Sequence, residues 1–329
     1  MKVKILISGS LLLLLVSCLF ASSTKHLSGN PVSIKRFDKI LFQYIEKNDS
    51  SLEETLKKEY PQMLEITGKA VLNMKSVDMP GFFDRLLNYY SEPTLNNLYR
   101  QALHKYEQTE EIEQKLGNGF ACLTELLPTL TQPEVYMHVS GFGQNVIAGD
   151  NLLSISIDKY MGEDFPLYED FFYDFQRRKM QPDYIVPDYL TGWLMSEFPF
   201  KGNENVLLER MIYEGKIKYL VNLAVPSMSE AQLLGYTEED FRWVEQHEGN
   251  IWRTIIERKH LYTPEHITTG LYFEERPSTF ISDNAPGNLG TFIGWQIVMR
   301  YMKETKETPV DLMSNTDAQN ILTRAKYKP

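Results

Sequence analysis

Cysteine and basic residues are both scarce in this chain of 329 residues. The two cysteines, Cys18 and Cys122, are too few for the disulfide framework that holds many secreted domains together. Lysine and arginine number 34 against 44 aspartate and glutamate residues, so the formal net charge is -10. Such a chain has no general electrostatic attraction to nucleic acid or to an anionic membrane surface, and we expect no nucleic-acid partner.

The sequence also lacks the common motifs of catalysis and cofactor binding. It contains no H-E-x-x-H zinc motif, no G-x-S-x-G nucleophile turn, no phosphate-binding loop, no dinucleotide-binding glycine pattern and no EF-hand. None of the 6 histidines lies four residues from another, as two zinc ligands on one helix would. These absences predict a protein without a bound metal or cofactor.

The N-terminal residues have the pattern of a bacterial lipoprotein signal. Lys2 and Lys4 precede an apolar run over 5–16, which is too short to span a bilayer. The run ends in L-V-S-C at 15–18, with a small residue before Cys18, the cysteine that would accept the lipid. We therefore predict a lipoprotein signal peptide over 1–17, lipidation of Cys18 and a tether over 18–30. The alternative is an ordinary secretory peptide cut after Ala21.

Lipidation would change the charge and the thiol content of the mature chain. Removal of residues 1–17 takes away two lysines and no acid, so the net charge becomes -12. Acyl chains on Cys18, not basic residues, would then anchor the protein to the membrane. Residues 19–23 lack the acidic stretch expected of a surface-exported lipoprotein, which favours the outer membrane with the protein facing the periplasm. Cys122, in an apolar stretch, is expected to be a buried and unreactive thiol.

Helical periodicity dominates the rest of the chain. Apolar spacing predicts helices over 34–45, 52–66, 82–90, 94–106, 112–130, 186–198, 206–225, 237–259 and 289–301. The stretches 135–139 and 153–157 are rich in β-branched residues and flank a glycine-rich segment, which predicts two antiparallel strands. The predicted fold class is α+β, predominantly helical with one small antiparallel or mixed sheet. We expect a single globular domain over 31–329, in which 31–131 form a helical layer.

Several stretches with a distinctive order are spread along the chain. They are the L-V-S-C run ending at Cys18, I-K-R-F-D at 34–38, S-I-S-I-D-K-Y-M-G at 154–162, L-L-E-R-M-I-Y-E-G-K at 207–216, L-G-Y-T at 234–237, N-I-W at 250–252 and P-G-N-L-G-T-F-I-G-W-Q-I-V at 286–298, followed by Tyr301 and Met302. In this order the stretches resemble the gliding-motility-associated lipoprotein family GldB of the Bacteroidetes, over nearly the whole chain. The resemblance implies a role in the envelope, with envelope proteins of the motility or secretion machinery as partners.

The same layout is more distantly similar to predicted zinc proteases, in which a strand, an H-E-x-x-H helix and a later Glu-Gly helix build a zincin-like site. In that comparison Asp188 and Gly192 stand where the two histidines would be, Tyr189 stands for the catalytic glutamate, and Glu214 stands for a third ligand. Glycine offers no ligand atom and tyrosine is no carboxylate base. The resemblance therefore implies a degenerate zincin-like core over 132–329, in which these four residues line a possible cleft without zinc.

The missing ligands and the resemblance together favour a non-catalytic, lipid-anchored envelope protein that binds another protein. One alternative is an envelope hydrolase, either an atypical metallopeptidase or a glycan hydrolase, that uses Asp188 and Glu214. A glycan or small-molecule binder is a third hypothesis, suggested by the 12% aromatic content. Both carboxylates also have structural interpretations, because Glu214 can pair with Arg210 or Lys218 one helical turn away and Asp188 can begin its helix.

Overall fold

The computed structural model describes residues 28–329. The predicted signal peptide, Cys18 and most of the predicted tether lie outside these residues.

The described chain opens with the short strand β1 (Ile34–Lys35), which pairs with β2. A helix was predicted from residue 34, but Ile34 and Lys35 are held in this pairing and the first helix begins at Phe37. The first group of helices comprises α1 (Phe37–Lys47), α2 (Ser50–Glu59), α3 (Pro61–Ala70), α4 (Phe82–Tyr90), α5 (Pro93–Lys105) and α6 (Glu110–Leu126).

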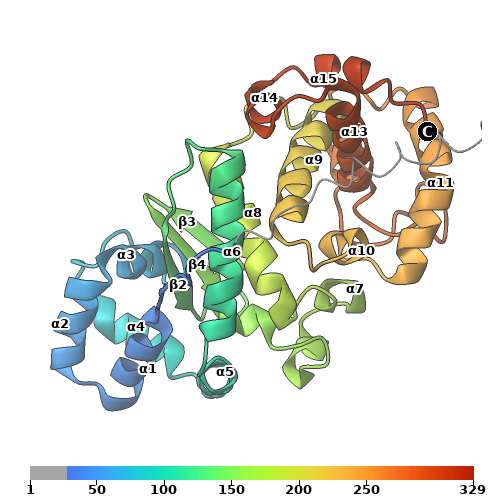
Figure 1. Ribbon diagram of the computed structural model, residues 1–329. Coiled ribbons are helices and arrows are strands. Elements are labelled where there is room, and N and C mark those ends of the chain that lie inside the picture. Colours follow the sequence, from blue (N-terminus) through green and yellow to red (C-terminus); the bar gives the residue numbers. More distant parts are fainter. Residues whose placement is uncertain (1–27) are drawn as a thin grey trace, which may run out of the picture.

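The strands of the described chain form one mixed sheet in the order β1-β2-β4-β3 (Figure 1). They continue with β2 (Glu134–His138), β3 (Val146–Gly149) and β4 (Leu152–Ser156). The prediction that 135–139 and 153–157 are antiparallel is wrong, because β2 and β4 are parallel neighbours. The chain reverses between β3 and β4, at Asp150 and Asn151, where Asn151 takes a left-handed φ of 53°. A strand as short as β3 gives too little alternation to be recognised inside a glycine-rich segment.

The second half of the chain is again mainly helical, and the predicted α+β class with one small sheet is confirmed. The seven helices predicted from 82–90 onward all form, with ends shifted by at most four residues. The remaining helices are α7 (Asp174–Arg177), α8 (Ile185–Glu197), α9 (Leu207–Ala224), α10 (Glu230–Leu234), α11 (Glu238–Glu257), α12 (His266–Leu271), α13 (Leu289–Thr305), α14 (Pro309–Ser314) and α15 (Ala318–Ala325), with 3-10 turns η1 (Ile157–Tyr160), η2 (Pro166–Asp170) and η3 (Pro182–Tyr184).

Helix α8 lies at the centre of the molecule. It packs on β3 and β4 and also contacts α6 and α9 (Figure 1). Trp193 of α8 is 1% exposed and lies edge-on to Phe120 of α6, with ring centroids 4.7 Å apart. Gly119 of α6 lets Leu190 approach, since a Cβ at Gly119 would lie 2.6 Å from a methyl group of Leu190. The apolar side chains of α8 thus join the sheet to the helices behind it.

The loop between β2 and β3 closes on the buried carboxylate of Asp158. That carboxylate accepts hydrogen bonds from the N–H groups of Phe142 at 2.7 Å and Ser140 at 3.2 Å, and from the hydroxyl of Ser156. Gly141 and Phe142 take successive left-handed φ values of 66° and 69°, so the chain curls around the carboxylate. The glycine-rich loop therefore binds an anionic group of its own chain.

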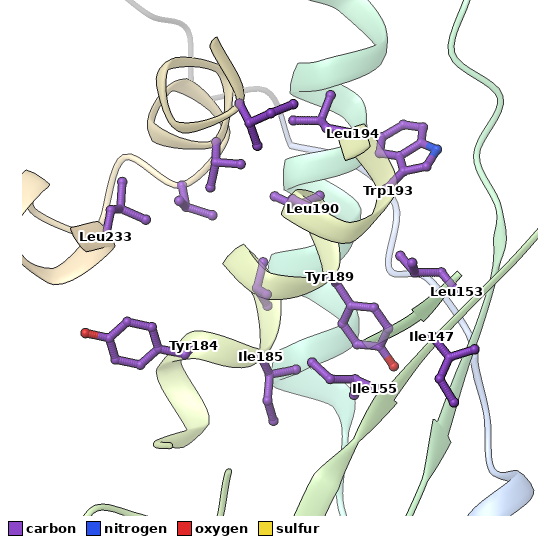
Figure 2. Packing of buried hydrophobic residues seen from close by; sticks show 14 of the residues in the cluster. Ile147, Leu153, Ile155, Tyr184, Ile185, Tyr189, Leu190, Trp193, Leu194 and Leu233 are labelled. Carbon is purple, nitrogen blue, oxygen red and sulfur yellow. The ribbon is translucent and has the colours of Figure 1, made fainter. Parts of the chain in front are cut away.

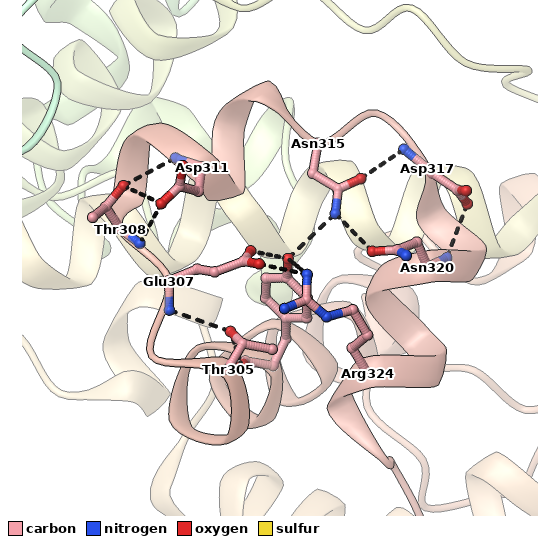
Figure 3. Close-up of polar contacts among 9 residues, drawn as sticks. Thr305, Glu307, Thr308, Asp311, Asn315, Asp317, Asn320 and Arg324 are labelled. Carbon is pink, nitrogen blue, oxygen red and sulfur yellow. Dashed lines mark hydrogen bonds and ion pairs between the residues drawn. The ribbon is translucent and has the colours of Figure 1, made fainter.

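The C-terminal helices are joined to α13 by a polar cluster (Figure 3). The hydroxyl of Tyr301 donates to the carboxylate of Glu307, which also forms an ion pair with Arg324 of α15. Asn315, directly after α14, donates to the Tyr301 hydroxyl at 3.3 Å. The buried ammonium group of Lys216 on α9 donates to the carbonyl oxygen of Asn315 at 2.5 Å. Four helices are thereby held together near the C-terminus.

Helices α9 and α13 touch through their backbones. A Cβ at Gly215 of α9 would overlap the backbone of Gly294 in α13, and a Cβ at Gly294 would overlap the carbonyl group of Met211. No flexible side chain lies at these contacts that could move aside. Both glycines are therefore required by the close approach of the two helices.

We predict that Gly294→Ala destabilises the protein by at least about 2 kcal/mol, because the added methyl group must push two helix backbones apart. Chemical unfolding followed by circular dichroism measures the change. The matched control is Gly270→Ala in α12, where an added Cβ meets nothing within 4 Å. That control should be neutral or should stabilise the protein by up to about 1 kcal/mol. Equal stabilities of the two variants would contradict the proposed backbone contact.

Candidate functional site

A cavity of about 390 Å³ lies where α8 meets the edge strand β3. Residues of α8 and of the β3 segment line it together with residues of η1, of the segment that contains α7, and Glu275. The lining residues are Asn145, Val146, Ala148, Lys159, Tyr160, Phe172, Gln176, Lys179, Met180, Asp188, Thr191, Gly192, Met195 and Glu275. The cavity thus combines charged, aromatic and backbone groups that come from separate parts of the sequence.

Asp188 is the carboxylate that α8 contributes to this cavity. The phenol of Tyr160 donates a hydrogen bond to Asp188 Oδ2 at 2.7 Å. Burial raises the pKa of Asp188, while the Tyr160 hydrogen bond and the charges of Lys179 and Lys218 oppose that rise. No side chain caps the N-terminus of α8. Asp188 thus lies in the first turn of α8, as its structural interpretation expected, and it also accepts from a phenol and is attracted by two lysine charges.

Glu214 lies on α9 and is not among the residues that line the cavity. Burial raises the pKa of Glu214, and the charges of Lys218, Arg210 and Lys179 oppose that rise. Within residues 28–329, Glu214 makes no ion pair closer than 4 Å, and the guanidinium group of Arg210 lies 4.1 Å from the ring centre of Phe273 instead. The helical pairing expected for Glu214 is therefore only a longer-range attraction.

Asp188 and Glu214 nevertheless belong to one cluster of charges. Lys179 and Lys218 act on both carboxylates, and burial lowers the pKa of Lys218. Lys179 also forms an ion pair with Glu275. The structure thus brings the two predicted carboxylates into a common electrostatic environment, but places only Asp188 at the cavity.

Tyr189 and Gly192 have structural roles. Tyr189 is fully buried, its hydroxyl donates to the carbonyl oxygen of Tyr136 in β2, and Figure 2 shows its ring directed toward Ile155 of β4. A Cβ at Gly192 would lie 2.6 Å from a methyl group of Val146, so glycine permits the close contact of α8 with β3. Of the four predicted cleft residues, Asp188 and Gly192 line the cavity and Tyr189 points away from it.

The residues at the zincin-like positions fit a zinc ion poorly. Residues 28–329 contain no group of three or more histidine, cysteine, aspartate or glutamate side chains that could hold a metal. Tyr189 uses its hydroxyl within the core and Gly192 has no side chain. The remaining candidates, Asp188 and Glu214, lie near two lysines whose charge opposes a bound cation.

Lys159, Tyr160 and Lys179 line the cavity and were not predicted from the sequence. The ammonium group of Lys159 lies 4.2 Å from the ring centre of Phe172, and burial lowers the pKa of this lysine. Lys159 and Tyr160 belong to the S-I-S-I-D-K-Y-M-G stretch at 154–162. That distinctive stretch could therefore have pointed to two of these three cavity residues. Lys179 lies outside the stretches that were singled out.

A family model described as gliding motility protein GldB matches residues 21–329. The chain belongs to the GldB family. The match covers the whole described chain and confirms the resemblance seen in the separate stretches. Neither a curated protein nor a solved structure matches the sequence.

Membership in a family of gliding-motility lipoproteins agrees with an anchor in the cell envelope. Cys18 precedes the residues matched by the GldB model and lies outside the described residues, so its lipidation stays a prediction. In residues 28–329 we find no helix with the length and apolar character needed to cross a membrane.

The thiol of Cys122 is partly buried, lies 3.5 Å from the Leu223 carbonyl oxygen and has a pKa raised by burial.

We predict that Tyr160→Phe raises the pKa of Asp188 further, because the carboxylate loses the hydrogen bond that stabilises its charged form. Carbon-detected NMR titration of the aspartate carboxyl groups measures the pKa. The control is Tyr184→Phe, since the Tyr184 hydroxyl donates to the Gln232 carbonyl oxygen and not to Asp188. A pKa of Asp188 that moves equally in both variants would contradict the role given to Tyr160.

Proposed function

We propose that this GldB-family chain is a non-catalytic, lipid-anchored protein of the cell envelope that binds another envelope protein at the cavity between α8 and β3. In this proposal acyl chains on Cys18 hold it to the outer membrane on the periplasmic side. Its binding activity supports the assembly or action of the gliding-motility or secretion machinery. Family membership supports the motility and envelope parts of the proposal, and the surroundings of the cavity support the binding part.

Exposed apolar side chains beside a charged cavity are the observation that carries the binding proposal. Met195 lines the cavity and is 37% exposed. Phe171 and Tyr173, which flank the cavity residue Phe172 in sequence, are 60% and 73% exposed. Phe171 and Phe172 both pack against the ring of Phe142, so they belong to one aromatic group. Exposed aromatic and methionine side chains around a pocket are typical of protein-binding surfaces.

The hydrolase alternative has less support. A glycan hydrolase needs two carboxylates on opposite sides of the scissile bond. Asp188 and Glu275 are the carboxylates that line the cavity, and Glu275 is paired with Lys179. Glu214, the second residue that the alternative requires, lies outside the cavity lining. A peptidase would need a zinc site, which these residues fit poorly.

We predict that the double variant Phe171→Ser, Tyr173→Ser reduces partner recovery at least about tenfold, because aromatic side chains supply much of the free energy of protein binding. Crosslinking and co-purification from detergent-solubilised envelopes measure recovery, and colony spreading of a gliding strain that depends on the variant measures function. The control is Ile267→Ser on α12, which is 72% exposed and not part of the cavity lining. Full recovery with the double variant would contradict binding at this cavity.

We predict that Glu214→Gln leaves gliding at the wild-type level, because this carboxylate lies outside the cavity lining and performs no chemistry in the proposed function. The amount of the variant protein in the envelope is measured as well, because a protein that does not accumulate would also abolish gliding. The purified protein should contain no stoichiometric transition metal in elemental analysis. One zinc per chain, or loss of gliding by Glu214→Gln at normal abundance, would favour the hydrolase instead.

A further inference from the structure

Strand β3 leaves one edge of the sheet unpaired in the described chain. It pairs with β4 alone, in an antiparallel ladder. The carbonyl oxygen of Asn145 accepts from the N–H of Ser156 at 2.8 Å, and the alternation of an antiparallel ladder then directs the polar groups of Ile147 and Gly149 to β4 as well. The N–H and C=O groups of Val146 and Ala148 therefore point away from β4. No hydrogen bond reaches them from residues 28–329.

Two cavities lie along this edge. Val146 and Ala148 line the first cavity of about 390 Å³, and Ala148 and Gly149 line a second cavity of about 240 Å³. Helix α8 contributes to both, through Asp188 to Met195 in the first and Trp193 to Glu197 in the second. Side chains on one face of a strand recur about every 6.6 Å. An extended chain beside β3 can thus place one side chain in each cavity.

Two residues of α8 that line these cavities carry polar atoms without a partner. The hydroxyl of Thr191, in the first cavity, and the indole nitrogen of Trp193, in the second, are buried and make no hydrogen bond within residues 28–329. Unpaired buried polar atoms cost free energy and are uncommon in folded proteins. Both residues lie on α8, the helix that lines the two cavities beside the unpaired strand edge.

A lysine in the first cavity indicates the kind of side chain that can enter it. In the first cavity Lys159 has no carboxylate within 4 Å in the described chain, whereas Lys179 is paired with Glu275. A carboxylate of a bound chain would complement Lys159. The second cavity is lined by polar and apolar residues together, with Ser196 and Glu197 beside Leu152 and Trp193, and it selects for no single kind of side chain.

We propose that the outer edge of β3 binds an extended segment of a partner protein as an added strand. An acidic side chain of that segment enters the first cavity beside Lys159, and the side chain two residues away enters the second. The main-chain hydrogen bonds form with Val146 and Ala148, and the first cavity selects the sequence. This inference rests on the proposed function, because it specifies how the partner is held.

A proline at position 148 tests the outer edge of β3 without disturbing the pairing of β3 with β4. Ala148→Pro removes an N–H group that points away from β4, so the β3–β4 ladder keeps its hydrogen bonds while the added strand loses a donor. Ala148→Ser is the matched control because it keeps that N–H group at the same exposed position. Circular dichroism and the thermal midpoint establish that both variants are folded.

The probe is a phage-displayed library of random dodecapeptides, selected on the purified full-length protein. We expect enriched peptides to share an acidic residue at one position. Synthetic copies should bind Ala148→Ser within about twofold of wild type and Ala148→Pro at least about tenfold more weakly. Methylation of the peptide's backbone nitrogens, one residue at a time, should weaken binding only at every second residue. This measurement does not depend on the folding of any protein variant.

Several results would overturn strand addition. They are the absence of enriched peptides, equal binding to Ala148→Pro, and an N-methylation profile without a period of two. Peptides that lose affinity with Lys159→Glu but ignore Ala148→Pro would reject strand addition and leave the proposed function standing. Failure of the proposed function is recognised separately, by full partner recovery with the Phe171→Ser, Tyr173→Ser variant.

Discussion

The direct contact between the backbones of α9 and α13 fixes the charged residues behind the cavity. Glu214 immediately precedes Gly215 at this contact, and Lys218 follows one helical turn later. Neither side chain is positioned by a close ion pair in the described chain, so their places are imposed by the helix that carries them. Because α9 also packs on α8, the same contact sets the distance between these charges and Asp188. The glycine of the Glu-Gly pair that suggested a metal site is thus explained by helix packing.

The helices could be predicted from the sequence because their information is local. The apolar periods over 82–90 and 206–225 are long enough to identify α4 and α9, and packing then keeps the same residues buried. Strand pairing is not local. Placing β2 beside β4 in parallel requires β3 to lie outside them, and four residues of β3 gave no signal against the simpler hairpin. The same limitation hid β1, since Ile34 also fits the period of the helix that follows it.

The site could be predicted only in the part that one helix contributes. Asp188, Gly192 and Met195 recur on one face of α8 and line the cavity, whereas Tyr189 lies about 100° further round the helix and faces the sheet. Helical geometry alone could have separated Tyr189 from the others. Lys159 and Lys179 could not be foreseen in the same way, because the turn η1 and the segment after α7 reach the cavity only through the tertiary fold.

The carboxylate that closes the loop before β3 also determines when the strand edge comes into existence. Asp158 follows β4 in the chain, whereas its N–H donors at Ser140 and Phe142 precede β3. These hydrogen bonds need the C-terminal ends of β2 and β4 side by side, so the loop before β3 is held only in a chain in which the two strands have paired. A chain that has not yet folded offers no prearranged edge to neighbouring unfolded chains. Burying Asp158 thereby couples the exposure of a potentially adhesive strand to completion of the sheet.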